Sequence, residues 1–405
     1  MILAKRGPPY KDKTATLIRA SLPTQKHRVL VAVLATFLLV EVALLYGCAS
    51  GGSTETPGIL PPPTPQPKVA LFQLPTADSF DAGITAGPDG NIWFVEGAIN
   101  VNQIGRIRIK DGSITEFPLS GCGTGGEYIA PGSDGNVWAS QFCFTNHNPP
   151  MGYPEMAVVA PDGSMRLIQM NTSEQPFRGA LGPDGNVWFT LPHHGMIGKI
   201  TTQGVATQYS LSTPLEPNPL PESLTPGPGG NIWVVEEGPY VDEVSTNGTI
   251  LNQFNSPFSG TGIALGPDGN LWIAGYDSDV IEKMTTNGVT TTYPIQNPCE
   301  PGFLTGPLSI AAGADGAMWF TESLGQGLGR IDMAGNMSTI CLGVAGFTWD
   351  VTSGPDSNIW FTATGLNAIG EVLIRHQEGT ENRSKRASTD ASYDVCASRE
   401  TLCRY

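Results

Sequence analysis

The sequence predicts an all-β protein, a seven-bladed β-propeller built from four-stranded blades. Three observations support this prediction. The 405 residues include 50 Gly and 34 Pro but only 15% charged residues, a composition typical of short strands joined by tight turns. One Trp-containing motif recurs seven times at the spacing of propeller blades. The last repeat lacks a fourth strand, and a matching segment precedes the first repeat.

The repeated motif places a Trp shortly after a Gly-rich turn. It reads Gly-Pro-Asp-Gly-Asn-Ile-Trp from Gly87. The seven tryptophans are separated by 39 to 50 residues and lie at positions 93, 138, 188, 233, 272, 319 and 360. The Asp-Gly pair supplies the positive φ angles that a tight hairpin needs. A Trp at the same site of every blade is expected to pack between blades, so these residues predict scaffold and not function.

The first repeat can be divided into four strands. They are expected at residues 83–86, 92–96, 104–109 and 114–119, with Gly-containing turns between the first and second and between the third and fourth. The same order returns at 197–211 and 281–295. Four antiparallel strands of this kind cannot bury both faces alone, so the repeats must stack side by side.

The two ends of the array predict how the ring closes. The last repeat stops after its third strand, at residues 369–374, whereas residues 69–74 match the pattern of residues 114–119. Phe72 precedes Trp93 by 21 residues, as Phe117 precedes Trp138. The N-terminal strand is therefore expected to complete the last blade, which removes the exposed edges of an open array.

The segments outside the repeats predict a tether. Residues 1–48 combine basic side chains with an apolar run over 29–46 that only Glu41 interrupts, which is typical of an export signal or membrane anchor. The run ends in Gly47-Cys48, which resembles a bacterial lipobox and makes Cys48 the expected lipidation site; an uncleaved anchor is the alternative. Residues 49–67 form a Gly/Ser/Pro-rich linker, 68–375 the propeller and 376–405 a disordered tail. We expect a membrane-anchored, extracytoplasmic protein of the cell envelope.

Charge and cysteine content narrow the possible partners. The formal net charge is -15, and the residues after position 47, with 15 basic and 35 acidic side chains, carry -20. A body of this charge disfavours nucleic acid and favours a cationic ligand or a divalent metal. An oxidising compartment permits disulfides, and the pairs expected first are Cys122 with Cys143 and Cys299 with Cys341. Free thiols remain the alternative.

Beyond the repeat pattern, residues 87–96, 104–107 and 114–119 resemble segments of the virginiamycin B lyase (streptogramin lyase) family. The resemblance extends over residues 69–374 and implies the seven-bladed fold. It also implies a Mg²⁺-assisted elimination that opens the ester ring of a streptogramin B peptide, with a His removing the neighbouring proton. In the family this His opens a first strand, and a carboxylate fourteen residues later ends the second strand.

The family's His position lies eleven residues before each Trp and contains no His in this chain. It is occupied by Ala82, Glu127, Phe177, Glu222, Thr261, Leu308 and Trp349. The carboxylate position, three residues after each Trp, is occupied by Glu96, Gln141, Leu191, Glu236, Gly275, Glu322 and Ala363. We therefore assign no catalytic residue and expect a ligand- or metal-binding module. The alternative is an active lyase or a lactonase-like metal-dependent enzyme in which Glu222 or His193 substitutes for the base.

Acidic residues at these positions give the candidate site. Glu222 and Glu236 keep the fourteen-residue spacing, and carboxylate oxygens suit Mg²⁺ or Ca²⁺; the alternative is that both are solvated rim residues. The same spacing places Glu96, Glu127 and Glu322 on the same face. His193 and His194 follow the second strand of the third repeat and belong to that face too. The expected partner is a small molecule or a cell-envelope ligand bound by a monomer.

Overall fold

The computed structural model describes residues 67–374, except residues 80, 98–100, 120–122, 125, 145–151, 173 and 344–346. The predictions for the N-terminal 48 residues, for linker residues 49–66 and for the tail at 376–405 lie outside the described residues. Within the part that is described, none of the helices has both the length and the apolar character needed to cross a bilayer.

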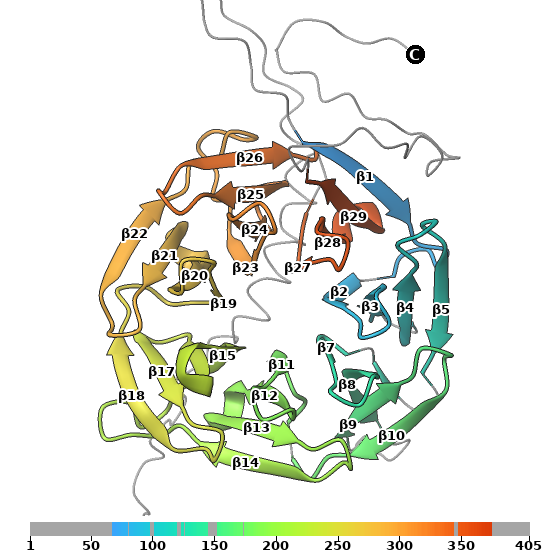
Figure 1. Ribbon diagram of the computed structural model, residues 1–405, viewed down its shortest axis with the longest axis horizontal. Helices are drawn as coiled ribbons and strands as arrows, with labels where there is room; N and C mark the ends of the chain where they lie inside the picture. Colours follow the sequence, from blue (N-terminus) through green and yellow to red (C-terminus); the bar gives the residue numbers. More distant parts are fainter. Residues whose placement is uncertain are drawn as a thin grey trace, which may run out of the picture. The chain divides into compact units, whose positions relative to one another are not determined.

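Seven antiparallel sheets stand around a common axis, which confirms the predicted propeller (Figure 1). Blade 1 contains β2 (Asp81–Ala86), β3 (Ile92–Glu96), β4 (Gln103–Ile107) and β5 (Ile114–Pro118). Blade 2 contains β6 (Gly123–Thr124), β7 (Ile129–Pro131), β8 (Val137–Phe144), β9 (Gly152–Val159) and β10 (Met165–Gln169). Blade 3 contains β11 (Gly179–Leu181), β12 (Val187–Leu191), β13 (Met196–Ile200) and β14 (Ala206–Ser210). Blade 2 differs from the four-strand prediction only because its long β8 also pairs with the two-residue β6.

The other blades follow the same order from the centre outward. Blade 4 contains β15 (Pro221–Pro226), β16 (Ile232–Glu236), β17 (Tyr240–Val244) and β18 (Ile250–Asn255). Blade 5 contains β19 (Gly262–Leu265), β20 (Leu271–Gly275), β21 (Val280–Met284) and β22 (Thr290–Pro294). Blade 6 contains β23 (Pro307–Ala312), β24 (Met318–Glu322), β25 (Gly327–Ile331) and β26 (Met337–Cys341). Blade 7 contains β27 (Val351–Ser353), β28 (Ile359–Ala363), β29 (Ala368–Leu373) and β1 (Lys68–Gln73).

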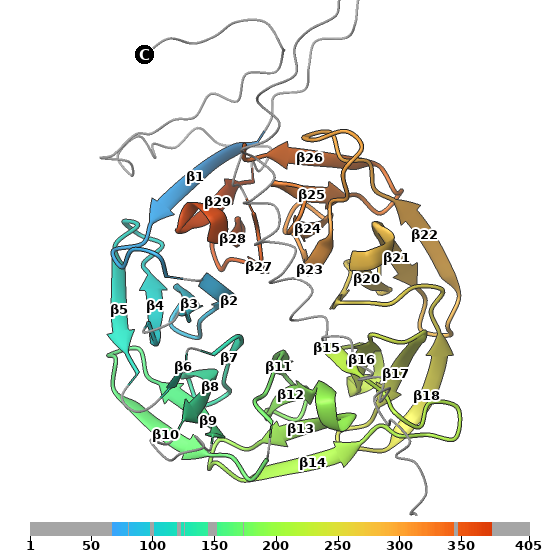
Figure 2. The same cartoon turned by 180° about the vertical axis from the view of Figure 1, so that it is seen from behind.

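The ring closes through the N-terminal strand, as predicted. β1 pairs antiparallel with β29 from Lys68 opposite Leu373 to Gln73 opposite Ala368, and it forms the outer edge of blade 7 (Figure 2). Phe72 on β1 stacks on Trp360 with ring centroids 5.5 Å apart. Phe117 stacks on Trp93 at the same distance, so the closing strand reproduces the packing of an ordinary fourth strand.

The repeated tryptophans form the core between blades. All seven are at most 1% exposed, and Trp360 of blade 7, for example, packs against Ile84 and Phe94 of blade 1. In six blades the Asp of the turn accepts a hydrogen bond from the Trp Nε1, as Asp89 does from Trp93 at 2.9 Å. The repeated Asp thus fixes the Trp ring as well as shaping the turn.

The strand registers define a single face for the candidate residues. Asp81 pairs with Glu96 and Pro307 with Glu322, each joining the start of a first strand to the end of the second. We call this end of the ring the ligand face, and the end with the Asp-Gly turns the turn face. Short 3-10 helices follow the second strand at the ligand face in three blades: η2 (Pro192–His194), η4 (Tyr276–Ser278) and η5 (Thr364–Leu366). A fourth, η3 (Pro228–Gly230), forms the turn of blade 4.

One of the two predicted disulfides is confirmed. Cys299 and Cys341 are bonded with their Cα atoms 5.5 Å apart, and the bond ties the loop before blade 6 to the end of β26. Cys122 and the side chain of Cys143 lie outside the described residues, so that pair stays a prediction. Lipidation of Cys48 stays a prediction for the same reason.

Candidate functional site

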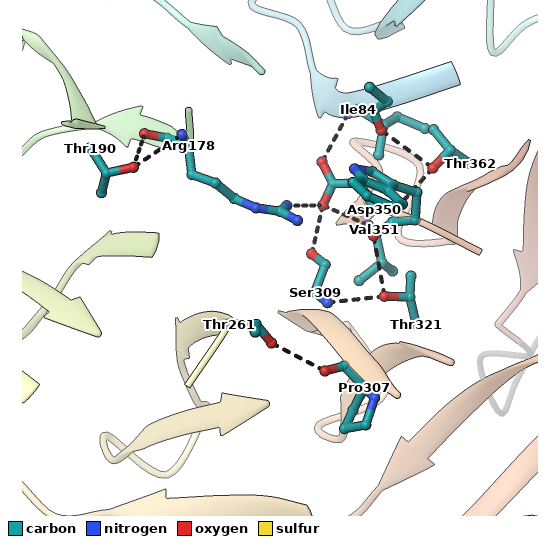
Figure 3. A network of polar contacts seen from close by, with 12 residues as sticks. Ile84, Arg178, Thr190, Thr261, Pro307, Ser309, Thr321, Asp350, Val351 and Thr362 are labelled. Atoms are coloured by element: carbon teal, nitrogen blue, oxygen red, sulfur yellow. Dashed lines mark hydrogen bonds and ion pairs between the residues drawn. The ribbon is translucent and has the colours of Figure 1, made fainter. Parts of the chain in front are cut away.

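An ion pair crosses the centre of the ring at the start of the first strands (Figure 3). Arg178, just before β11, places its Nη1 3.6 Å from the Oδ1 of Asp350, just before β27, and the two side chains are 13% and 16% exposed. The pair joins blade 3 to blade 7, which are not neighbours. Because both groups are largely withdrawn from water, their attraction is screened less than that of a surface pair.

The Asp350 carboxylate is also held by two further blades. It accepts hydrogen bonds from the Ser309 hydroxyl of blade 6 at 2.6 Å and from the Ile84 amide of blade 1 at 3.0 Å. The Val351 amide next to it donates a third at 2.9 Å. One carboxylate therefore links blades 1, 3, 6 and 7.

Threonines on the second strands support this centre. The hydroxyl of Thr362 accepts from the Asp350 amide at 2.9 Å and donates to the Ala82 carbonyl of the next blade at 3.4 Å. Thr321 and Thr190 make the corresponding contacts from blade 6 to blade 7 and from blade 3 to blade 4. Thr261 reaches the Pro307 carbonyl at 3.1 Å. These bonds fix the backbone at the family's His position, where Ala82, Glu222 and Trp349 supply the carbonyls.

Glu222 lies beside this axial pair. Its side chain is buried, with 8% exposure. Burial, followed by repulsion from Glu237, raises its pKa to about 8, with Arg178 opposing and Glu127 reinforcing the rise. Glu127 is half-buried in the same neighbourhood. The structure thus brings Glu127, Glu222 and Arg178 into one electrostatic group at the axis.

Glu236, the predicted partner of Glu222, has different neighbours. It is fully buried at the end of β16. Burial and then Asp242 of β17 raise its pKa to about 9, with Glu216 adding to the repulsion. The groups that act most strongly on Glu222 are therefore not those that act on Glu236. The Glu222–Glu236 metal site stays a prediction. The carboxyl group that acts most strongly on the pKa of Glu236 is that of Asp242.

Glu96 and Glu322 end the second strands of blades 1 and 6 and are fully buried as well. Glu96 accepts a hydrogen bond from Gln103 Nε2 at 3.1 Å, and burial above all raises its pKa to about 7. Glu322 accepts from the Thr339 hydroxyl at 2.9 Å, and burial raises its pKa to about 8. The alternative that Glu222 and Glu236 are solvated rim residues is wrong, because both side chains are withdrawn from water, as are those of Glu96 and Glu322.

These carboxyls do not form a ready-made metal centre. Among the residues with described positions, no three His, Cys, Asp or Glu side chains converge in a way that would hold a metal ion. Two of the carboxylates could supply at most four oxygens, and Mg²⁺ or Ca²⁺ takes six or more. The predicted cation would need water or backbone oxygens to complete its shell.

His193 and His194 form a separate group in η2. The Nδ1 atoms of both imidazoles contact one carboxylate, Glu174, at 2.5 and 2.7 Å. The His193 amide also donates to Glu174 at 2.9 Å. A carboxylate on Nδ1 fixes the tautomer and orients the ring, which is how imidazoles are prepared for proton transfer or metal binding. The side chains of the two histidines are 57% and 45% exposed.

A cavity of about 490 Å³ lies away from all of these groups, in the loop before blade 6. Asp279, Ile295, Asn297 and Phe303 contribute to its wall, and Phe303 is 70% exposed. None of the predicted site residues lines it. The chemistry of this protein is therefore better judged from the axial group than from this cavity.

Sequence reasoning missed Arg178, Asp350, Asp242 and Glu174. The first two occupy a single column of the repeat, ten residues before each Trp. The other members of that column are Gly83, Tyr128, Ser223, Gly262 and Ser309. One cation and one anion among uncharged residues were the available signal for an ion pair across the ring. Asp242 and Glu174 left no comparable signal, because neither occupies a family position.

Comparison with known proteins agrees with the observed propeller fold. The profile of the virginiamycin B lyase family matches residues 63–148, 164–305 and 257–381. A virginiamycin B lyase from Nocardia farcinica is 24% identical over 217 residues, which are 53% of this chain and 71% of that protein.

Solved structures show the same fold. A streptogramin B lyase structure superposes with a TM-score of 0.64 at 24% identity, covering 76% of this chain and 97% of its own. Virginiamycin B lyase from Staphylococcus aureus gives a TM-score of 0.64 at 25% identity, covering 76% of this chain and 100% of its own. A catalytically inactive histidine-to-alanine variant of the S. aureus enzyme, solved with quinupristin, gives 0.63 at 25% identity and the same coverages.

Proposed function

Because this chain belongs to the virginiamycin B lyase family, we propose that it is a ligand-binding propeller that keeps the family's scaffold without its lyase reaction. The observation that carries the proposal is the occupancy of the family's His position, where none of the seven residues is a His. In this structure three of those residues, Ala82, Glu222 and Trp349, offer their carbonyls to threonines of the preceding blade. An imidazole that could remove a substrate proton is missing from these positions.

A named relative supports the separation of binding from turnover. The S. aureus variant that lacks one histidine is described as catalytically inactive and was nevertheless solved with quinupristin. Loss of the base in a family member is thus compatible with ligand binding. By analogy, this chain would bind without opening a ring.

We place the ligand over the axial group. Arg178 and Asp350 present both charges at the centre of the ring, and Glu222 and Glu127 add acidic groups beside them. A small molecule that carries a cationic group fits this arrangement and the acidic body of the protein. Convergent polar groups at the centre of a rigid ring are a typical binding site.

The test is a turnover assay with quinupristin and Mg²⁺, with the S. aureus enzyme as the positive control. We expect no ring opening by this protein at concentrations where the control converts the substrate completely. Rapid, catalytic ring opening that depends on Mg²⁺ would overturn the proposal. A single slow turnover would also count against the proposal, because ring opening requires a base.

The His193–Glu174 contact favours one alternative, a metal-dependent lyase or lactonase-like enzyme with a substituted base. An imidazole with a carboxylate on Nδ1 is prepared to accept a proton at Nε2. If activity on lactones or cyclic depsipeptides is found, His193→Gln should reduce kcat far more than KM. An active His193→Gln variant would exclude this residue as the base.

The site is proposed to lie outside the cytoplasmic membrane, on a tether anchored at Cys48 or on an uncleaved N-terminal anchor. The support is the apolar run, the small residue before Cys48 and the linker that follows. Labelling of cells with a lipid precursor should mark the parent and not Cys48→Ala. If neither protein is labelled and the two migrate alike, the uncleaved anchor is favoured.

A further inference from the structure

Blade 4 buries two carboxyl groups against each other with no donor between them. Glu236 at the end of β16 and Asp242 in β17 are both fully buried, and the strand register, with Asp242 opposite Val234, puts the two side chains on the same face of the sheet. Within the described part of the chain, none of the four oxygens accepts a hydrogen bond of normal geometry. The amide of Gln253, opposite Asp242 on β18, lowers the pKa of Asp242, but its Nε2 is also without a hydrogen-bond partner. Buried carboxylates without partners are strongly unfavourable, so a positive charge or a proton is required here.

Two other blades show how a buried carboxylate at this end of the sheet is satisfied. In blade 1 the Gln103 amide donates to Glu96, which lies directly opposite, at 3.1 Å. In blade 2 the Gln141 amide donates to Glu155, again directly opposite, at 2.6 Å. In blade 4 the third-strand residue with a carboxyl is Asp242, which lies opposite Val234, two residues before Glu236. Asp242 adds a second carboxylate there and no donor.

A third carboxylate and an open space adjoin the pair. The charge of Glu216 raises the pKa of both Glu236 and Asp242. A methyl group placed on Gly238 would meet only two atoms within 4 Å, Glu236 Oε2 at 3.9 Å and Glu216 Oε2 at 4.0 Å. The space beside Gly238 is therefore open, and the nearest atoms that border it are carboxylate oxygens.

We propose that blade 4 holds one divalent cation between Glu236 and Asp242, with Glu216 at its entrance. This inference goes beyond the proposed ligand function and does not depend on it. Two carboxylates that each bind through both oxygens supply four ligands, and water in the space beside Gly238 completes the shell. Ca²⁺ tolerates such irregular shells better than Mg²⁺. The cation stabilises these buried carboxylates, as the hydrogen bonds from the Gln103 and Gln141 amides stabilise Glu96 and Glu155 in blades 1 and 2.

The experiment is calorimetric titration of the full chain in detergent with Ca²⁺, and with Mg²⁺ for comparison, at constant pH. We expect one saturable site for Ca²⁺. Glu236→Gln and Asp242→Asn should each weaken Ca²⁺ binding at least tenfold. Each should also raise the Tm of the metal-free protein, because the new amide can donate to the remaining carboxylate as Gln141 does.

Matched variants separate this site from its neighbours. Glu282 is the buried carboxyl of the third strand in blade 5 and already accepts from the Ser256 hydroxyl at 2.9 Å, so Glu282→Gln should leave the Ca²⁺ affinity unchanged. Glu222→Gln should also leave it unchanged, since Glu222 belongs to the axial group. Gly238→Ala, which fills the space without removing a carboxylate, should weaken binding.

Three results would overturn the proposal. The first is the absence of saturable binding at millimolar Ca²⁺. The second is unchanged binding in both Glu236→Gln and Asp242→Asn. The third is a Tm that depends on pH but not on Ca²⁺, which would show that the pair holds only a proton. Loss of binding in Glu222→Gln would instead support the Glu222–Glu236 site predicted from the sequence.

Discussion

The two faces of this propeller use carboxyl groups in opposite ways. At the turn face, six blades place an Asp where it accepts hydrogen bonds from a Trp and, in most cases, from an Asn, as Asp268 does from Trp272 and Asn270. At the ligand face, carboxyls of several blades are buried with one or both oxygens unpaired, among them Glu96, Glu236 and Glu322. The turn face is satisfied in six of the seven blades, whereas the ligand face leaves carboxyl oxygens unpaired in several blades.

This difference shows that the unfavourable interactions of buried carboxyl groups lie at the ligand face. An unpaired buried carboxyl costs stability, whereas a carboxylate with several donors adds to it. Proteins commonly violate local rules at functional sites and compensate elsewhere in the structure. The inter-blade tryptophans and their Asp partners provide that compensation here.

The largest expected effect is an opposite pH response of the two faces. Burial raises the pKa of Glu222 and Glu322 to about 8 from 4.5, so the folded state binds more protons than the unfolded state between these values. The free energy of unfolding should therefore fall as pH rises from about 4.5 to 8, by roughly 5 kcal/mol if each unit contributes about 1.4 kcal/mol and the shifts are partly relieved by relaxation. Denaturant unfolding at pH 5, 7 and 9 measures this.

The turn face should dominate below pH 4. Although burial alone would raise it, hydrogen bonds from Asn270 and Trp272 hold the pKa of Asp268 below its usual value. Stability from such groups is present above the unfolded pKa of 3.8 and is lost as pH falls through the folded value. A curve that is flat between pH 5 and 9, or that rises, would contradict the assignment of the ligand face. Glu322→Gln should flatten the upper part of the curve.

The second effect concerns the disulfide at the ligand face. Replacing Cys299 and Cys341 by Ser should lower the free energy of unfolding by about 3 kcal/mol, because the bond closes a loop with a sequence separation of 42 residues. Thermal unfolding with and without a reductant provides the measurement. If the reductant lowers the Tm of the double Ser variant as much as that of the parent, the effect comes from other cysteines.

The third effect tests the turn face. Asp268→Ala leaves the Nε1 of the buried Trp272 without its acceptor and should cost about 2 kcal/mol. Blade 4 provides an internal comparison, because Gly229 replaces the Asp there and the Trp233 Nε1 has no partner. A loss below about 0.5 kcal/mol in chemical denaturation would mean that the other blades tolerate the blade 4 arrangement equally well.

The smallest effect on stability is expected at the axis. Arg178→Met removes the ion pair, but Asp350 keeps its bonds from Ser309, Ile84 and Val351. The free energy of unfolding should change by only about 1 kcal/mol, whereas binding of a ligand over the axial group should be lost. Thermal shift and calorimetry on the same preparation separate the two. A large fall in Tm would make Arg178 a structural residue of the ring.

The repeat made most of the fold predictable. The Trp spacing gave the number of blades, and the match of residues 69–74 to a fourth strand gave the closure that β1 and β29 confirm. The arithmetic of the repeat also placed Glu96 and Glu322 on the correct face. It could not show their burial, because position along a strand does not reveal how closely the next blade packs.

The candidate site was less predictable for a physical reason. The Arg178–Asp350 pair joins residues that are far apart in the chain and in non-adjacent blades, and only the closed ring brings them together. The Glu236–Asp242 pair depends on side-chain direction at the end of β16 and in β17, where the two residues are not directly opposite each other. Such contacts leave no periodic signal in the sequence.

Closure by the N-terminal strand also has a consequence for how the chain folds during synthesis. Among the described strands, β1 is the first to be made and its partner β29 is the last. β1 therefore remains unpaired while the other six blades form, and the edge of β29 in blade 7 stays exposed until β1 pairs with it. The same edge can accept β1 from a second molecule with the same register, which is the requirement for a domain-swapped dimer. The yield of correctly closed rings should thus depend on protein concentration during folding, although the finished ring has no such dependence.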